Sequence, residues 1–166
     1  LLEHISKQGV DYFYKGEVAN RIVEEINLRG GCFESSDMET YVSKFRTPVK
    51  SNYRGCDVYA FSPPSGGCAL LEMLNILDLR AMGHNTAESL HALAESMKLG
   101  FADRSVALGD PDFVQVDVDR LISKRFANER YELLSEKAGE FAAAEAIEAK
   151  QYPGNTSHFA IMDRAG

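Results

Sequence analysis

The first regular alternation of hydrophobic and polar positions lies in residues 17–28. Val18, Ile22 and Ile26 recur at helical spacing, and charged residues occupy most of the positions between them. Residues three or four apart lie on one face of a helix, so this pattern is typical of an amphipathic helix. The pair Gly30-Gly31 then ends it, because glycine adopts the left-handed backbone that often follows a helix.

Four further segments have helical patterns. The strongest, residues 68–82, is apolar around most of its circumference and predicts a buried core helix, although four polar residues interrupt it: Glu72, Asn75, Asp78 and Arg80. The next begins at Asn85 and Glu88, which resemble a capping box. Its apolar residues mark one face: Leu90, Leu93, Ala94, Met97 and Phe101. The remaining two are a short helix capped within Ser35 to Asp37 and ending at Tyr41, and a helix from Asp119 to Leu134.

Strand-forming residues are concentrated in two places. Residues 44–61 are rich in aromatic and β-branched side chains around the turn residues 52–55, which predicts a β-hairpin. Residues 156–164 alternate as a half-buried strand does. Between these regions, residues 136–155 form an Ala- and Glu-rich arm with few large apolar anchors, and we expect it to be loosely held. The pattern predicts an α+β chain that is mostly helical.

The composition is that of an ordinary globular protein and narrows the choice of partners. Hydrophobic residues make up 45% of the 166 residues and charged residues 26%, enough for a sizeable core. The 18 basic and 25 acidic side chains give a net charge of −7, which argues against nucleic acid as a partner. The longest apolar stretch is too short and too polar to cross a bilayer, so we expect no membrane span.

The titratable side chains predict neither a metal site nor a cofactor. The three cysteines, Cys32, Cys56 and Cys68, have no metal-ligand spacing and do not indicate a disulfide framework. No nucleotide-binding glycine motif is present. The pair Asp103-Arg104 could be a substrate clamp, but a structural ion pair is the simpler interpretation. The tetrapeptide Asn155-Thr156-Ser157-His158 places a hydroxyl where a loop enters the predicted strand, and spacing alone favours an ordinary polar strand start.

Six blocks of residues, taken together, change that interpretation. In chain order they are Arg29-Gly30-Gly31 with Asp37 and Tyr41; Tyr53-Arg54-Gly55 with Val58-Tyr59; Pro63-Pro64-Ser65-Gly66-Gly67 leading into residues 70–77; Phe101-Ala102-Asp103-Arg104; Leu108-Gly109-Asp110-Pro111-Asp112-Phe113; and Thr156-Ser157-His158. In order and approximate spacing they resemble the gamma-glutamyltransferase family of the N-terminal nucleophile hydrolase superfamily. The proline-rich block is one residue shorter than the usual family pattern.

The resemblance implies a self-processing enzyme without a cofactor. The residue that matches the family's nucleophile is Thr156, and the family's precursor cuts itself before it, here between Asn155 and Thr156. Ser157 and His158 match the next two family positions, for which we expect supporting roles. The implied substrates are glutathione or other γ-glutamyl donors, with water, amino acids or peptides as acceptors. A threonine hydroxyl needs an adjacent base, and cleavage would supply one as the free α-amino group of the same residue.

The resemblance also implies an architecture and a location. The family fold is a four-layer αββα sandwich, to which this chain would contribute outer helices, a hairpin and one central strand. Residues 1–155 would be the C-terminal part of the large subunit, with the hairpin at 44–61 and the arm at 136–155. Residues 156–166 would be the first strand of the small subunit. We expect a heterodimer after cleavage and, by resemblance, a periplasmic or extracellular location.

Three functional hypotheses remain open at this stage. The first is γ-glutamyl transfer or hydrolysis, although the residues expected for the donor carboxylate and the oxyanion hole lie outside this stretch, so these 166 residues alone should be inactive. The second is a related amide acylase resembling cephalosporin acylase. The third is a non-catalytic helical module that binds a partner through residues 68–82.

Overall fold

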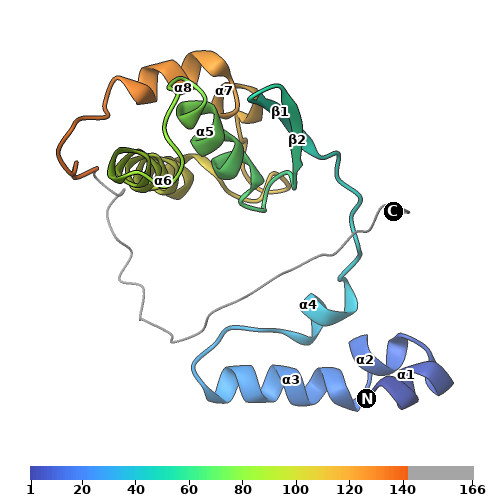
Figure 1. Ribbon diagram of the computed structural model, residues 1–166. Helices are drawn as coiled ribbons and strands as arrows, with labels where there is room; N and C mark the ends of the chain where they lie inside the picture. Colours follow the sequence, from blue (N-terminus) through green and yellow to red (C-terminus); the bar gives the residue numbers. More distant parts are fainter. Residues whose placement is uncertain (142–166) are drawn as a thin grey trace. The chain divides into compact units, whose positions relative to one another are not determined.

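The computed structural model describes residues 1–141, which fall into two compact units. The first unit comprises residues 1–45, and the second begins at Arg46. Figure 1 shows the four helices of the first unit and, in the second, a two-stranded sheet and the helices that follow it in the sequence. This confirms a mostly helical α+β chain with a small sheet. The strand predicted over 156–164 lies outside the described residues.

The first unit consists of α1 (Leu2–Gln8), α2 (Asp11–Tyr14), α3 (Glu17–Leu28) and α4 (Ser35–Glu39). Helix α3 has the bounds that the hydrophobic pattern predicts. Helix α4 is capped differently from the prediction. The cap is Glu34, whose carboxylate accepts the backbone N–H of Asp37 while the Asp37 carboxylate accepts that of Glu34. The predicted cap residues Ser35 to Asp37 are therefore already inside the helix.

The hairpin of the second unit pairs β1 (Val49–Tyr53) with β2 (Cys56–Ala60) in antiparallel register, Val49 opposite Ala60. Its turn consists of Arg54 and Gly55, with φ angles of 50° and 82°. Two consecutive left-handed residues match the twist of the flanking strands, which is why two-residue hairpin turns favour this conformation. The Gly55 N–H also donates to Asn52 Oδ1 at 3.1 Å. The turn predicted over residues 52–55 is thus present.

Helix α5 (Gly67–Leu77) is the centre of the second unit and contacts the hairpin and the helices that follow it. Its buried side chains join two hydrophobic clusters, one of Val49, Cys68 and Leu71, and one of Ile76, Leu99 and Ala127. The prediction that this segment is a core helix is confirmed. The predicted end at Met82 is wrong, because the helix stops at Leu77 and the Asp78 carboxylate turns to the hairpin instead.

The start of α5 depends on a close backbone approach at Gly67. A Cβ at this position would overlap the carbonyl oxygen of Phe61 and lie 2.9 Å from the Ala60 Cβ. We therefore expect Gly67→Ala to destabilise the protein by about 1–3 kcal/mol, the range for overpacked sites. The neighbouring Gly66→Ala is the matched control, since no atom lies within 4 Å of its Cβ position. Urea unfolding of both variants measures the difference, and equal losses would contradict the steric explanation.

Helix α6 (Ala87–Ala107) begins one residue later than predicted. The capping box consists of Thr86 and Ser89, with the Thr86 Oγ1 accepting the Ser89 N–H at 3.1 Å. Asn85 instead has a φ of 55° and belongs to the preceding turn. Thr86 is therefore the N-cap of α6, in place of the predicted Asn85.

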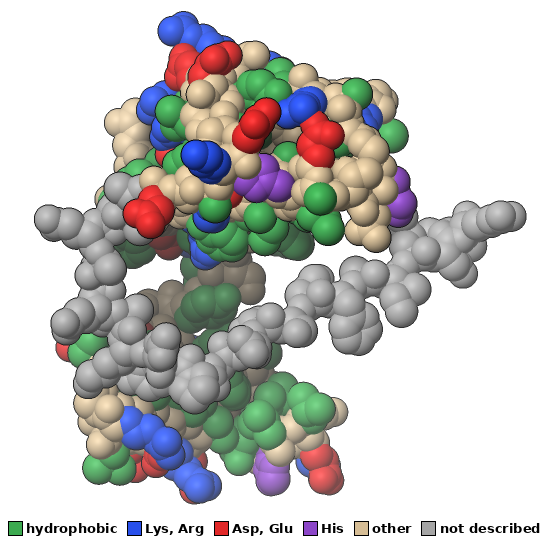
Figure 2. All heavy atoms as spheres, turned by 60° about the vertical axis from the view of Figure 1, so that its left-hand side comes forward, with side chains coloured by type: hydrophobic (Ala, Val, Ile, Leu, Met, Phe, Trp, Pro, Cys, Tyr) green, Lys and Arg blue, Asp and Glu red, His purple; other side chains and the backbone are tan. Residues whose placement is uncertain are grey.

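The buried face of α6 is not its most hydrophobic one. Its buried residues are Glu95, Ser96, Leu99, Gly100 and Asp103. Gly100 allows the close approach of α5, since a Cβ there would meet the Met73 side chain. Four large apolar residues stay 42–53% exposed: Leu90, Leu93, Met97 and Phe101. Figure 2 shows hydrophobic side chains among charged ones on the surface of the molecule. We call these four residues the α6 apolar stripe.

The segment predicted as one helix from Asp119 to Leu134 forms two, α7 (Val118–Leu121) and α8 (Lys124–Tyr131). The break lies at Ser123, which has an extended backbone and accepts the Phe126 N–H on its hydroxyl oxygen at 3.1 Å. A serine that caps a helix in this way cannot continue the preceding one, because the cap residue has non-helical angles. The hydrophobic pattern carries no sign of this interruption.

Candidate functional site

The residues predicted to carry the chemistry, Asn155, Thr156, Ser157 and His158, lie outside the described residues. So does most of the arm predicted over 136–155. The first part of that arm, residues 136–141, contacts α6. Glu95 Oε2 accepts the Gly139 N–H at 2.9 Å, and Lys98 Nζ donates to the Gly139 carbonyl at 2.6 Å. The five blocks that precede these residues in the sequence lie within the described residues.

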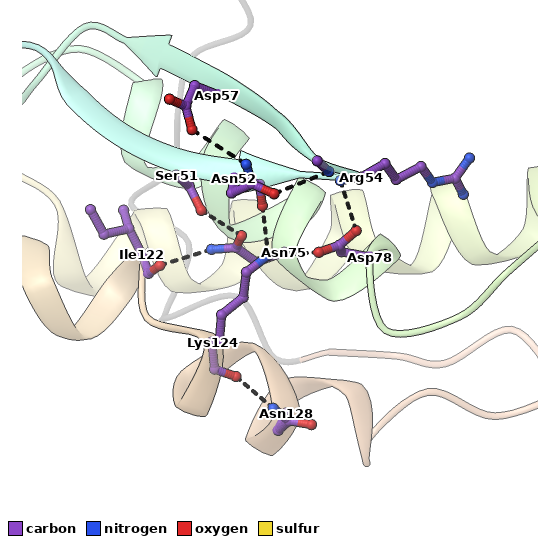
Figure 3. A network of polar contacts seen from close by, with 10 residues as sticks. Ser51, Asn52, Arg54, Asp57, Asn75, Asp78, Ile122, Lys124 and Asn128 are labelled. Atoms are coloured by element: carbon purple, nitrogen blue, oxygen red, sulfur yellow. Dashed lines mark hydrogen bonds and ion pairs between the residues drawn. The ribbon is translucent and has the colours of Figure 1, made fainter.

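The third block contributes the buried side chain of Asn75, which contacts strand β1 and the segment after α7. Its amide oxygen accepts the Ser51 hydroxyl at 2.7 Å, and its Nδ2 donates to the Ile122 carbonyl at 2.8 Å. Figure 3 shows this side chain lying between the hairpin and the segment that joins α7 to α8. Asn75 is fully buried. One amide thus joins three segments that are far apart in the sequence.

A second polar junction holds the hairpin turn to the end of α5. Asp78 Oδ1 accepts the Arg54 N–H at 3.0 Å, and Asp78 Oδ2 pairs with Lys124 Nζ at 2.8 Å (Figure 3). Lys124 also donates to the Asn52 carbonyl at 2.7 Å. The bond from Lys124 lowers the pKa of Asp78, and the backbone bond from Arg54 acts in the same direction. The Tyr53-Arg54-Gly55 block therefore helps to hold the hairpin turn against the end of α5.

The fourth block contains Asp103, which forms an ion pair, but not with its neighbour Arg104. Its partner is Arg130 of α8, whose Nη2 contacts Asp103 Oδ1. Asp103 is 5% exposed, and the fully buried Glu72 of α5 lies beside it. The prediction of a structural ion pair holds for Asp103, while the predicted partner is wrong. Residues 27 positions apart can meet here because α6 and α8 both pack on α5.

The fifth block is a turn held by an arginine. Arg46 Nη2 lies 2.7 Å from Asp112 Oδ2 and 3.4 Å from Asp110 Oδ1, and the Asp112 N–H donates to Asp110 Oδ1 at 3.0 Å. Pro111 stands between the two aspartates and fixes the backbone of the turn. The acidic side chains of this block therefore hold the loop after α6 to the segment before β1.

In the first unit, the Arg29-Gly30-Gly31 block lies in a turn whose two ends are joined by hydrogen bonds. The Asn27 side chain donates to the Phe33 carbonyl at 2.8 Å and accepts the Phe33 N–H at 2.9 Å. Gly30 has a φ of 83°, which favours glycine. Tyr41, from the same block, stacks on the Tyr14 ring with centroids 5.7 Å apart. Two residues of this block thus have local partners, Tyr41 on the Tyr14 ring and Arg29 in an ion pair with Glu25.

A hollow of about 650 Å³ lies between α5, α6 and the chain after α8. Its lining is mostly apolar, with Arg80, Glu88, His91 and Glu95 among the polar members. Arg80 pairs with Glu88, Glu95 pairs with Lys98, and His91 Nε2 lies 2.8 Å from the Ser135 carbonyl. These polar groups are already engaged by the protein, so we assign the hollow no binding role.

Residues 1–141 contain no group of three or more metal-ligating side chains close enough to hold an ion. Among the same residues no helix is long and apolar enough to cross a membrane. The sequence predicts the polar residues Glu72 and Asn75 only as interruptions of an apolar helix, and the structure shows both of them buried, Asn75 with two hydrogen-bond partners. Their spacing of three residues on one helix is the signal that could have identified them.

The whole chain, residues 1–166, matches the family model described as gamma-glutamyltranspeptidase. A glutathione hydrolase proenzyme of Escherichia coli is 36% identical over 171 residues, covering 99% of this chain and 30% of the relative. The chain therefore spans about a third of that relative's length.

Two solved structures are similar in fold and sequence. The gamma-glutamyltranspeptidase of Helicobacter pylori is 38% identical with a TM-score of 0.69, covering 79% of this chain and 39% of that one. A cephalosporin acylase from Bacillus halodurans is 31% identical with a TM-score of 0.72, covering 82% of this chain and 26% of that one.

Proposed function

Because this chain belongs to the gamma-glutamyltranspeptidase family, we propose that it serves in γ-glutamyl transfer and hydrolysis by an enzyme that cuts itself before Thr156. The observation that carries the proposal is the match of the family model to the entire chain, including Thr156-Ser157-His158. The 36% identity to a glutathione hydrolase proenzyme supports glutathione or a similar γ-glutamyl compound as donor. Water, amino acids or peptides would be the acceptors, and no cofactor is needed.

The self-cleavage step follows from the chemistry of adjacent residues. The Thr156 hydroxyl attacks the carbonyl carbon of Asn155, the C–N bond breaks, and an ester replaces the amide. Water then hydrolyses the ester, which leaves a carboxylate on Asn155 and a free α-amino group on Thr156. With a pKa of roughly 8, this amine can accept a proton near neutral pH. Cleavage thus places a base on the residue that carries the nucleophile.

The transfer reaction reuses the same hydroxyl. Thr156 attacks the γ-amide carbonyl of the donor while its α-amino group accepts the hydroxyl proton. That proton passes to the departing amine as the C–N bond breaks and a γ-glutamyl ester forms. Water or an acceptor amine then attacks the ester and regenerates the hydroxyl. We assign Ser157 and His158 supporting roles in orienting this strand.

The proposed assembly has two subunits in a four-layer αββα sandwich. Residues 1–155 would belong to the large subunit and residues 156–166 would begin the small one. The α6 apolar stripe supports the layered arrangement, because a helix with exposed apolar residues on one side is suited to packing against another layer. The similarity of fold to the Helicobacter pylori enzyme supports it as well.

A related amide acylase is the second candidate, favoured by the TM-score of 0.72 to a cephalosporin acylase. The two functions differ in the acyl group that they accept. We expect the full-length processed protein to turn over γ-glutamyl-p-nitroanilide with a kcat/KM at least roughly 100-fold above that for a cephalosporin with a glutaryl side chain. The opposite preference would identify the acylase. A chain that stays uncut and hydrolyses neither substrate would support the non-catalytic module.

A further inference from the structure

Three helices of the second unit each place one ionisable side chain in the same buried cluster. Glu72 of α5 is 1% exposed and Asp103 of α6 is 5% exposed. Arg130 of α8 pairs with Asp103 and lies over the Phe126 ring, 4.9 Å from its centroid. A buried charge is costly unless it is paired and hydrogen-bonded, so the number of charges in such a cluster is constrained.

The charges of this cluster do not balance if every group has its usual form. Two carboxylates would face one guanidinium. Three buried atoms of the cluster have no hydrogen-bond partner among the described residues: the oxygens Glu72 Oε1 and Asp103 Oδ2, and the nitrogen Arg130 Nε. A proton on the Glu72 carboxyl would supply the missing donor, because the Glu72 hydroxyl could then donate to the Asp103 carboxylate. One proton therefore satisfies both oxygens and balances the charge.

The other charged groups near Glu72 within residues 1–141 have partners of their own. Besides Asp103 and Arg130, the titratable group nearest along α5 is the Cys68 thiol, one turn earlier, which is buried and brings no positive charge. In the hairpin, Lys50 is paired with Asp57. In α7, Arg120 stacks on Phe126, 4.9 Å from the ring centroid. In α6, Lys98 is paired with Glu95, and in α8, Lys124 is paired with Asp78. Within residues 1–141, Arg130 is the cation that acts on Glu72.

We propose that Glu72 is protonated in the native state and donates a hydrogen bond to Asp103. Glu72, Asp103 and Arg130 then hold α5, α6 and α8 together, and we call these three side chains the lock. The stability that the lock contributes decreases as the pH rises. The lock depends only on residues within 1–141 and is independent of the chemistry at Thr156. It would make the stability of the protein depend on pH through a single carboxyl group.

The direction of the pH dependence follows from the native and unfolded states. Burial, then the bond and the charge of Asp103, raise the pKa of Glu72 from its ordinary value of 4.5 to about 9, while Arg130 acts in the opposite direction. Between these two values the native state holds a proton that the unfolded state has released. Each pH unit in this interval therefore increases the unfolding equilibrium constant by about tenfold through this group. Below about pH 4.5 the contribution is complete, and above about pH 9 it has been lost.

The test compares the full-length chain with its Glu72→Gln variant. Glutamine keeps an N–H donor for Asp103 but cannot ionise, so the variant should lose the pH-dependent contribution. We expect the ratio of the wild-type to the variant unfolding constant to rise by about tenfold per pH unit between pH 5.5 and 8.5. Urea unfolding followed by circular dichroism gives both constants. A ratio that stays constant over this range would overturn the proposal.

Glu129→Gln is the matched control, because Glu129 lies on α8 in an exposed ion pair with Arg125. Its unfolding constant should keep the wild-type pH dependence. If Glu72→Gln does not fold, infrared spectroscopy of the wild-type protein provides a second measurement. A protonated-carboxyl C=O band that persists at pH 7 in the native protein and disappears on unfolding supports the lock. Its absence from the native protein refutes it.

Discussion

Thr156→Ala is expected to leave the chain uncut between Asn155 and Thr156 and to abolish γ-glutamyl transfer. Without the hydroxyl no ester can form, so neither the cleavage nor the acyl-enzyme step can occur. The loss of kcat/KM should be roughly three orders of magnitude or more, as for other enzymes that lose their nucleophile. Intact-mass analysis of the full-length protein measures the cleavage, and hydrolysis of γ-glutamyl-p-nitroanilide measures the activity.

Two further variants separate the role of Thr156 from a general disturbance of the junction. Thr156→Ser keeps a hydroxyl and should still be cleaved, at a lower rate. Ser157→Ala removes the adjacent hydroxyl and should be cut at the same bond, because we assign Ser157 only a supporting role. If Thr156→Ala is processed at the wild-type position, or if Ser157→Ala alone stays uncut, the proposed nucleophile is incorrect.

The elements that could be predicted from the sequence are those whose pattern reflects local physics. Helix α3 has the predicted bounds because its hydrophobic positions repeat over three turns between two glycine breaks. The hairpin was identifiable because Arg54-Gly55 is a two-residue turn between strand-forming residues. Helix α5 was identifiable as core because few helices carry so many apolar residues.

The features that the sequence predicted wrongly, or did not predict, depend on contacts between distant residues. Helix α5 stops at Leu77, and the side chain of the next residue, Asp78, bonds to the hairpin turn 24 positions earlier. On α6, Gly100 lies against α5 where a Cβ would meet the Met73 side chain, while the α6 apolar stripe stays exposed on the other side. The hydrophobic pattern of a single helix predicts neither where α5 ends nor which side of α6 is buried.

For the candidate site, too, some residues could be predicted from the sequence and others could not. The nucleophile could be suggested only through the resemblance, since a Thr-Ser-His tripeptide at a strand start is not distinctive by itself. The residues that build the framework before it, such as Glu72 and Asn75, appear in the sequence as polar interruptions. Folding brings Asp103 and Arg130 to Glu72, and it brings Ser51 and the Ile122 carbonyl to Asn75. Only these contacts identify the structural roles of the two residues.

Asn75→Ala is expected to cause the largest loss of stability among substitutions in the polar network of the second unit. The change removes two hydrogen bonds and leaves the Ser51 hydroxyl and the Ile122 carbonyl without their partner in a buried region. Removing one partner of a buried pair costs about 1–3 kcal/mol for each group left unsatisfied. We therefore expect the free energy of unfolding of the full-length protein to fall by about 2–4 kcal/mol, measured by urea titration.

Asn128→Ala is the control that isolates burial as the cause. Asn128 is the same residue type and belongs to the same network (Figure 3), where its side chain donates to the Lys124 carbonyl at 2.7 Å. It is exposed, so water can replace the bond and the expected change is within about 0.5 kcal/mol. Equal effects of the two substitutions would mean that the Asn75 bonds do not hold the hairpin, α5 and the α7–α8 junction together. A large effect of Asn75→Ala alone would show that this one buried amide holds the hairpin, α5 and the α7–α8 junction together.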